Sequence, residues 1–316
     1  MTNDKNMTKP VIIIDEKPDV VAGQAAGETP IITIEEGGGA DIKPAKPIHR
    51  RWLTVLTTAV TALVTCTLLI GGGLAYRYFF AFGVPISTSP KENIMKLEHT
   101  VVRDSMAKVV MTGDSILGVA MNFYKLSGLK AEIALTQPDT TDTNVVLCTR
   151  CSDYTASGQY LGSLVVGGKV LCTDRSRVGY CGMANGNVVI GISRSEKVKD
   201  YCAERGGAFF RQFVLVSDGV LPTRFVLHGK MERRALGRMA DDSIYLIETR
   251  HKETLWDFAD ALREYGFVDA IYITGGLSRS WYRSADGVCH DIGAMDERVP
   301  KGISDGSVPW LVFKRK

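Results

Sequence analysis

The sequence has little net charge, and its N-terminal end lacks aromatic residues. Lys and Arg number 38 against 35 Asp and Glu, and a net charge of +3 is too small to indicate a nucleic-acid-binding protein. Residues 1–51 contain no Phe, Trp or Tyr, so they cannot bury enough apolar surface to offset their ordering entropy. We therefore expect a disordered cytoplasmic tail there, although the 45% hydrophobic content of the whole chain excludes a fully disordered protein.

Two β-branched runs lie within this tail, and each ends in an acidic pair. Residues 10–16 read Pro-Val-Ile-Ile-Ile-Asp-Glu, and residues 30–36 read Pro-Ile-Ile-Thr-Ile-Glu-Glu. Such runs can add a strand to the edge of another protein's sheet, which would make them a site for a cytoplasmic partner. The alternative interpretation is a chance bias in low-complexity sequence.

Charged residues are absent from Trp52 to Tyr76. At about 1.5 Å per residue, a helix of this length exceeds a hydrocarbon core of about 30 Å, so we predict a single transmembrane helix over residues 52–76. The run begins too far into the chain, and is too long, for a cleavable signal peptide. We expect the threonines of the span to return their hydroxyl groups to the helix backbone. Its three glycines at 71–73 either allow close packing with another helix or form a flexible helix end.

Basic residues are unequally distributed around this span. His49, Arg50 and Arg51 precede it, whereas only Arg77 follows it closely, which favours a cytoplasmic N-terminus and an exported C-terminal domain. The chain has one Asn-x-Ser/Thr triplet, at Asn6 in the tail. An exported domain without glycosylation acceptors fits a bacterial envelope, so we expect a periplasmic domain anchored in the inner membrane.

Cysteines are few, seven in all, and only Cys66 lies in the predicted span. In an oxidising compartment the others allow many disulfide pairings, among which the sequence does not choose. Cys148 and Cys151 form a lone Cys-x-x-Cys, which is either a redox pair or half of a zinc site. Because no second such pair completes a tetrahedral site, we expect no metal and no other cofactor.

The region after the span is rich in short β-branched runs bounded by turn residues, which predict strands. These runs are 131–135, 144–147, 164–166, 188–192, 213–216, 243–247, 270–273 and 310–313. We predict an α+β fold with a mixed sheet and a few helices. The domain itself is expected over residues 129–316, after a juxtamembrane linker and lead-in over residues 77–128.

The clearest helical pattern covers Leu255 to Tyr265, where apolar residues recur at i, i+3, i+4 and i+7. Thr254 and Asp257 predict a capping box at its start, and Gly266 predicts its end. The next strand, 270–273, breaks at Thr274-Gly275-Gly276. Glycines at that point either leave backbone N–H groups free for an anionic oxygen or form an ordinary tight turn.

The order of these segments resembles the phosphodiester glycosidase family, which includes the lysosomal uncovering enzyme and bacterial envelope proteins. Residues 234–237, Arg-Ala-Leu-Gly, resemble the family's Arg-Thr-Ala-Ile-Gly, and the segment 233–237 is expected to form a hairpin with the segment 241–247. Residues 273–278, Ile-Thr-Gly-Gly-Leu-Ser, resemble its Leu-Asp-Gly-Gly-Gly-Ser signature. Residues 151–154, Cys-Ser-Asp-Tyr, lie where the family carries Asn-Gly-Gly-Phe-Phe. The resemblance covers roughly residues 129–316.

This resemblance implies an enzyme that cleaves a sugar phosphodiester at the anomeric carbon, and it implies the site residues. Arg234 would clamp an anion, unless it is a solvated surface residue. Gly275, Gly276 and Ser278 would bind substrate. Thr274 replaces the family's Asp, and a hydroxyl neither ionises nor shuttles protons near neutral pH. Asp153 is then the nominated carboxylate, unless it merely caps a turn. Weaker candidates are Glu248, Asp218, Asp269 and His290, and neither Ser278 nor Ser280 has a His partner that would make it a nucleophile.

Three interpretations of function follow. The first is a membrane-anchored envelope hydrolase of sugar phosphodiester bonds, acting on glycan or polymer linkages. The second is a catalytically impaired relative that binds glycan phosphates or a protein partner. The third is a structural envelope protein that merely keeps the fold.

Overall fold

The computed structural model describes residues 48–79, 88–99, 106–155, 157–225, 227–274, 280–293 and 308–315. The predicted disordered tail, including the runs at 10–16 and 30–36, lies outside these residues, as do Gly275, Gly276 and Ser278. Four helices are described: α1 (Ile48–Phe79), α2 (Pro90–Glu98), α3 (Lys197–Glu204) and α4 (Leu255–Tyr265). The remaining elements are strands, which confirms the predicted α+β class, and all strand pairings in the described chain are antiparallel.

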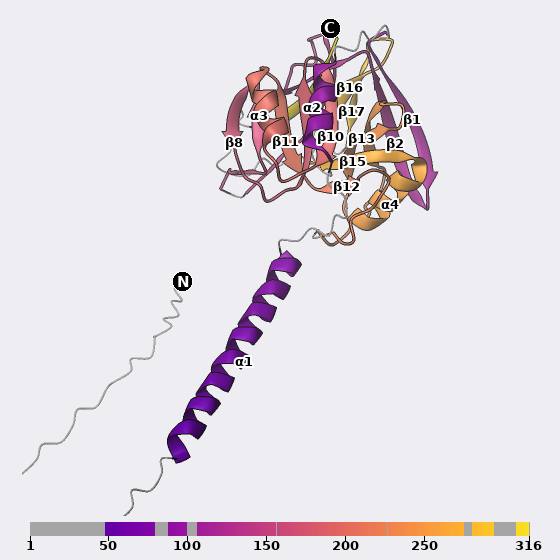
Figure 1. Ribbon diagram of the computed structural model, residues 1–316. Coiled ribbons are helices and arrows are strands. Elements are labelled where there is room, and N and C mark those ends of the chain that lie inside the picture. The colour runs from indigo at the N-terminus through magenta and orange to yellow at the C-terminus, as the bar shows by residue number, and fades with distance from the viewer. Residues whose placement is uncertain are drawn as a thin grey trace, which may run out of the picture. The chain divides into compact units, whose positions relative to one another are not determined.

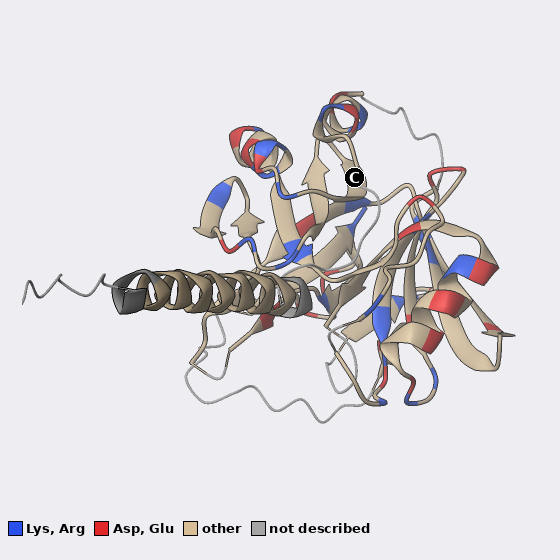
Figure 2. Ribbon diagram, turned by 60° about the horizontal axis from the view of Figure 1, so that its bottom comes forward, with Lys and Arg blue, Asp and Glu red and all other residues tan. Residues whose placement is uncertain are grey.

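Helix α1 contains a segment long and apolar enough to cross a membrane. That segment is Trp52–Tyr76, with a mean hydropathy of 2.1 and no buried residue. It carries no Lys, Arg, Asp or Glu, as Figure 2 shows. The hydroxyl groups of Thr57, Thr58, Thr61 and Thr67 donate to backbone carbonyls three or four residues earlier, as the sequence predicts.

The largest sheet has six strands and holds the arginine motif. Its order is β1 (Lys108–Ile116), β2 (Val119–Ser127), β14 (Ile244–Thr249), β13 (Arg234–Met239), β15 (Phe267–Ile273) and β12 (Val214–Val216). The predicted hairpin is present as β13 and β14, with Arg234 opposite Glu248. The strands β1 and β2 come from the expected lead-in, and β2 pairs with β14 of this sheet. The predicted domain boundaries remain predictions.

Two five-stranded sheets complete the domain (Figure 1). One has the order β10 (Asn187–Ile192), β9 (Gly179–Ala184), β11 (Ala208–Gln212), β7 (Leu164–Val166) and β8 (Lys169–Cys172). The other has the order β17 (Cys289–Ile292), β16 (Ser280–Arg283), β4 (Val145–Arg150), β18 (Trp310–Lys314) and β3 (Lys130–Ala134). A short hairpin of β5 (Asp153–Tyr154) and β6 (Tyr160–Leu161) forms a separate two-stranded sheet. The main hydrophobic core gathers side chains from all three large sheets.

Helix α4 has the bounds and the caps that its sequence predicts. The Thr254 hydroxyl accepts from the backbone N–H of Asp257 at 3.0 Å and donates to its carboxylate at 2.6 Å. Gly266 ends the helix with a φ of 106°, a left-handed conformation that suits glycine. The apolar face, with Leu255, Phe258 and Leu262 buried, joins a core cluster with residues of β12 and β15. The helix therefore holds β15 in place, and β15 leads directly into Thr274.

Candidate functional site

The carboxylate of Asp153 is the point at which three distant segments of the chain meet. Asp153 opens β5, Thr274 follows the end of β15, and Gln212 ends β11. The Thr274 hydroxyl donates to Asp153 Oδ1 at 2.9 Å, and Gln212 Nε2 donates to Asp153 Oδ2 at 2.6 Å. The sequence nominated Asp153 and Thr274 separately, and the structure brings them into direct contact.

Gln212 is itself fixed in orientation. Its side chain is completely buried, and its Oε1 accepts from the backbone N–H of Phe213 at 3.0 Å. An amide whose oxygen is engaged in this way must present its NH₂ group to Asp153. Both oxygens of the carboxylate are consequently held by side chains, one at the end of β11 and one directly after the end of β15, so Asp153 does more than cap a local turn.

Two arginines place positive charge beside this carboxylate. The Arg177 guanidinium stacks over the Phe213 ring at 3.6 Å, and that of Arg150 lies over the Tyr154 ring at 4.9 Å. Burial lowers the pKa of Arg177, and burial lowers the pKa of Arg150 to about 10, while the charge of Asp153 opposes both changes. Because an arginine side chain keeps its proton in proteins, both groups are cationic at neutral pH. Among the described residues, no carboxylate oxygen lies within 4.0 Å of the Arg177 guanidinium nitrogens.

Arg234 is completely buried, which excludes a solvated surface residue. Its Nη2 forms an ion pair with Glu248 Oε1 at 2.9 Å, and its Nη1 donates to Ser280 Oγ at 2.8 Å and to Thr149 Oγ1 at 3.3 Å. These partners come from β14, β16 and β4, so one guanidinium links the six-stranded sheet to a five-stranded sheet. Arg234 also lies opposite Ile273 in the β13–β15 register, directly before Thr274. It is thus placed to hold the strand ends around Asp153.

The weaker candidates are engaged in other contacts. Glu248 is the partner of Arg234, and the Ser280 hydroxyl donates to Thr149 Oγ1 at 2.9 Å. Asp269 binds the Arg238 guanidinium and accepts from the backbone N–H of Asp218. Asp269 lies four residues before Ile273 on β15, so it is about 13 Å along the strand from the end that leads into Thr274. His290 stacks on the ring of Tyr282 at 5.0 Å on an outer strand.

Sequence reasoning missed Gln212, Arg177 and Arg150. Arg177 lies in a loop between β8 and β9 and Gln212 at the end of β11, and neither stands in a motif. Arg150 precedes the expected 151–154 motif by one residue and could have been noticed as a charge beside it. Only the pairing of β11 with β7 and β9 reveals that Gln212 reaches Asp153.

The described cysteines are all free thiols. Cys148 and Cys151 point into different core clusters, so this Cys-x-x-Cys does not present both sulfur atoms to one site. Within the described ranges, no group of three or more His, Cys, Asp or Glu side chains is arranged to hold a metal ion.

One family sequence profile shows to which protein family this domain belongs. The profile of the family described as phosphodiester glycosidase matches residues 143–304, a range that includes Asp153, Arg234 and Thr274. The chain belongs to the phosphodiester glycosidase family. The family that the motifs resemble is thereby confirmed, and the domain has the fold of a hydrolase family.

The solved structures that match this chain include two of low sequence identity. The zebrafish N-acetylglucosamine-1-phosphodiester α-N-acetylglucosaminidase catalytic domain, auto-inhibited by its propeptide, is 14% identical, with a TM-score of 0.47. The match covers 69% of this chain and 86% of the zebrafish chain. A hypothetical protein from Synechocystis is 10% identical with a TM-score of 0.45, over 66% of this chain and 62% of the other. No curated protein sequence matches this chain.

Proposed function

We propose that this phosphodiester glycosidase domain hydrolyses the bond between the anomeric carbon of a sugar and the oxygen of a phosphodiester. The observation that carries the proposal is the Asp153 carboxylate, held between Thr274 and Gln212 beside the cationic side chains of Arg177 and Arg150. A carboxylate next to an anion clamp is what this reaction requires. The family match supports the same substrate class.

The proposed reaction begins with the phosphodiester anion bound against Arg177 and Arg150. Water attacks the anomeric carbon, and its proton passes to Asp153 acting as general base. The bond from the anomeric carbon to the bridging oxygen breaks, and that oxygen leaves with its electron pair as part of a phosphomonoester. Because a phosphomonoester is a stable anion, its departure needs no second carboxylic acid. The two guanidiniums stabilise the negative charge that develops on the leaving group.

Thr274 then acts as a positioning residue and not as a substitute for the family's Asp. Its hydroxyl donates to Asp153 Oδ1 at 2.9 Å and so orients this carboxylate, which lies on β5 and not at the end of β15. Arg234 fixes the neighbouring strand ends through Glu248, Ser280 and Thr149. Gly275, Gly276 and Ser278, which follow Thr274 in the sequence, are the proposed substrate-binding loop.

We further propose that the helix Trp52–Tyr76 anchors the protein in the inner membrane of a bacterium. The excess of basic residues before the span supports a cytoplasmic N-terminus and a periplasmic domain. The substrate is then a sugar phosphodiester of the cell envelope, such as a glycan linkage near the membrane. The runs at residues 10–16 and 30–36 are proposed contacts for a cytoplasmic protein partner.

The test uses the full chain in detergent micelles and a sugar linked through its anomeric oxygen to nitrophenyl phosphate. Cleavage at the anomeric carbon releases nitrophenyl phosphate, which gives colour only after added phosphatase, whereas cleavage at phosphorus to release nitrophenol gives colour directly. We expect phosphatase-dependent colour and a fall in kcat of about 100-fold or more in Asp153→Asn. Asp114→Asn, on the exposed strand β1, is the matched control and should retain full activity. Full activity in Asp153→Asn would refute the assigned base.

A second function, binding without turnover, is favoured by the presence of Thr274 where the family carries Asp. The same preparation distinguishes it, because a binding protein gives no colour but saturable calorimetric binding of the sugar phosphodiester. Binding in either case should be weakened about tenfold by Arg177→Ala, since the clamp is shared. If Thr274→Asp turns a silent binding protein into a hydrolase, the chain is a decayed enzyme.

A further inference from the structure

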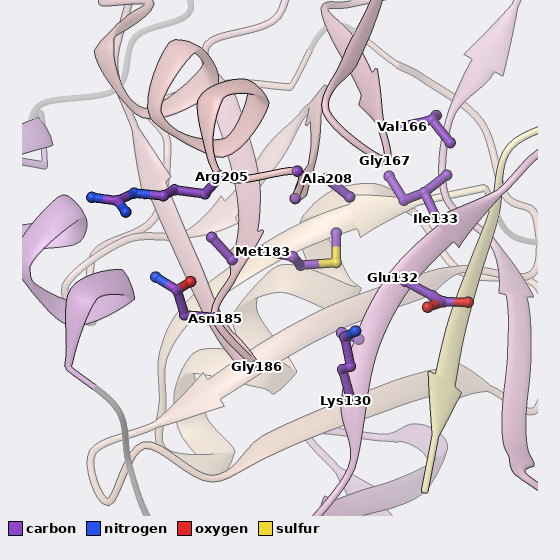
Figure 3. Close-up of a pocket in the computed structure, with 14 residues that line it drawn as sticks. Lys130, Glu132, Ile133, Val166, Gly167, Met183, Asn185, Gly186, Arg205 and Ala208 are labelled. Atoms are coloured by element: carbon purple, nitrogen blue, oxygen red, sulfur yellow. The ribbon is translucent and has the colours of Figure 1, made fainter. Parts of the chain in front are cut away.

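A cavity of about 620 Å³ lies apart from the candidate site (Figure 3). One wall is strand β3, and the opposite wall is formed by the ends of β7, β9 and β11 with their adjoining turns. Strand β11 begins at this cavity with Ala208 and ends at Gln212 beside Asp153, about 13 Å away along the strand. The cavity therefore belongs to the opposite end of that sheet from the candidate site.

The wall formed by β3 is an edge of its sheet among the described strands. β3 is the last strand of its sheet and pairs with β18 alone among the described strands. Along an antiparallel strand, the backbone N–H and C=O groups of successive residues point alternately to one neighbouring strand and to the other. The backbone N–H of Cys151 donates to Pro309 O, so Pro309 and every second residue after it in β18 point their polar groups toward β4. The residues between them point toward β3, and the register of β18 with β3 then leaves the N–H and C=O groups of Ala131 and Ile133 pointing away from β18, toward the open edge. An edge of this kind is a template for one more strand.

The floor of the cavity is apolar. Met183 and Ala208 are almost completely buried, and Figure 3 shows both side chains in the space between β3 and the ends of β9 and β11. Ile133 and Val166 line the same space on the side of β3 and β7. Because successive side chains of a strand alternate between faces, an added strand would place every second side chain on this floor.

The rim of the cavity is positively charged. Glu132 is compensated by Lys314, whose Nζ lies 2.5 Å from its Oε1. The Arg205 guanidinium lies over the Tyr201 ring at 5.4 Å, and neither Arg205 nor Lys130 has a carboxylate within 4.0 Å in the described chain. The Arg205 side chain points away from β3 (Figure 3), whereas Lys130 belongs to β3 itself and favours a ligand carrying Asp or Glu.

From this combination we propose that the cavity binds an extended acidic peptide segment of a partner protein. The segment adds to β3 as a further strand, through main-chain hydrogen bonds with Ala131 and Ile133. Its apolar side chains pack on the floor at Met183 and Ala208, and its acidic side chains lie near Lys130. The edge of β3 provides affinity for any extended chain, whereas the floor and Lys130 select its sequence.

The experiment pans a library of random nine-residue peptides on the immobilised full chain in detergent micelles. Peptides that are enriched are then synthesised, and their Kd is measured by fluorescence polarisation. We expect enriched peptides to alternate apolar residues with Asp or Glu and to lack Pro. The amide protons of β3 should become protected from hydrogen exchange when such a peptide binds.

Two variants and one control decide the outcome. Ala131→Pro removes an N–H at the open edge, a position where proline is tolerated in folding, and should raise Kd at least tenfold. Lys130→Glu should do the same through charge repulsion and keeps the proposal testable if Ala131→Pro does not fold. Lys108→Glu, an exposed lysine on β1, should leave Kd unchanged. The proposal is overturned by the absence of enriched peptides, by enrichment of basic peptides, or by affinities that Lys130→Glu does not alter.

Discussion

At the scale of single residues, the site depends on two hydrogen bonds to the Asp153 carboxylate, one from the Thr274 hydroxyl and one from the Gln212 amide. Thr274 cannot ionise near neutral pH, so it cannot take over the chemistry of the Asp that the family carries at this position. Its hydroxyl does, however, donate a hydrogen bond to Asp153 Oδ1, and Gln212 Nε2 donates one to Oδ2. In this chain the carboxylate therefore lies on β5, and the position after the end of β15 supplies a hydroxyl that binds it.

Removal of the Thr274 hydroxyl tests this division of roles. Thr274→Val keeps the shape of the side chain but loses the bond to Asp153, so we expect kcat to fall about tenfold, the equivalent of one hydrogen bond to a charged group. KM should change little because Thr274 does not contact the phosphodiester in the proposed mechanism. Thr274→Ser restores the hydroxyl and should restore kcat. Steady-state kinetics in which the Val variant matches the wild type would contradict the positioning role.

At the scale of elements, helix α3 is fastened to strand β11 by a buried ionic network. Glu196, the residue before α3, accepts from Arg211 Nη2 at 2.8 Å and pairs with Lys199 at 2.8 Å. Arg211 is completely buried, and the next residue in the chain is Gln212. The network therefore anchors the strand that carries one of the two donors to Asp153.

The pH dependence of stability should report this network. Burial raises the pKa of Glu196, but hydrogen bonds and charge from Lys199 and Arg211 outweigh it, and the net pKa is lowered from 4.5. A lowered carboxylate pKa contributes stability above about pH 4.5 that is lost as the pH falls through the folded-state value. We expect Glu196→Gln to reduce the free energy of unfolding by roughly 2–3 kcal/mol at pH 7, because it leaves a buried arginine without its carboxylate partner.

Urea titrations of the full chain in micelles measure this loss. The difference between the wild type and Glu196→Gln should narrow as the pH is lowered below 4.5, since the wild-type carboxylate then becomes neutral as well. Glu204→Gln, at the exposed C-terminal end of the same helix, is the matched control and should change stability by less than about 0.5 kcal/mol. A difference that stays constant down to pH 3 would contradict the ionic origin of the effect.

At the scale of the whole molecule, the six cysteines that follow helix α1 divide into two accessibility classes. Cys148, Cys151, Cys181 and Cys202 are completely buried, and burial raises the pKa of each thiol, that of Cys202 to about 12. Cys172 and Cys289 are partly exposed. Because the thiolate is the reactive form, only the second class should react with an alkylating reagent while the domain is folded.

Mass spectrometry after iodoacetamide treatment at pH 8 tests this pattern. In the folded protein we expect labels at Cys172 and Cys289, and none at the four buried positions. In urea without reductant, all four should become labelled, which also distinguishes free thiols from disulfides. Labelling of Cys151 in the folded state would contradict the packing of the core, and absence of labelling in urea would indicate a disulfide.

The sequence by itself determined the features that depend on local pattern. Helix α4 was predicted with its bounds and both caps, because period, capping box and glycine all lie within a dozen neighbouring residues. The apolar span of α1 and the hairpin of β13 and β14 were predictable for the same reason. The family followed from the order of short motifs along the chain. Strand β1 escaped prediction, since it buries only one of its residues and shows no alternating pattern, and β2 was missed although its burial largely alternates.

Tertiary structure alone decided which residues meet. Thr274 lies 121 residues from Asp153, and Gln212 lies 59 residues from it, so no local pattern relates them. Strand pairing also determined that Arg234 is buried against Glu248 and is not a surface residue, because its neighbours come from three other strands in two sheets. Charge and residue type can be read from a sequence. Contact between distant residues is a property of the packed sheets.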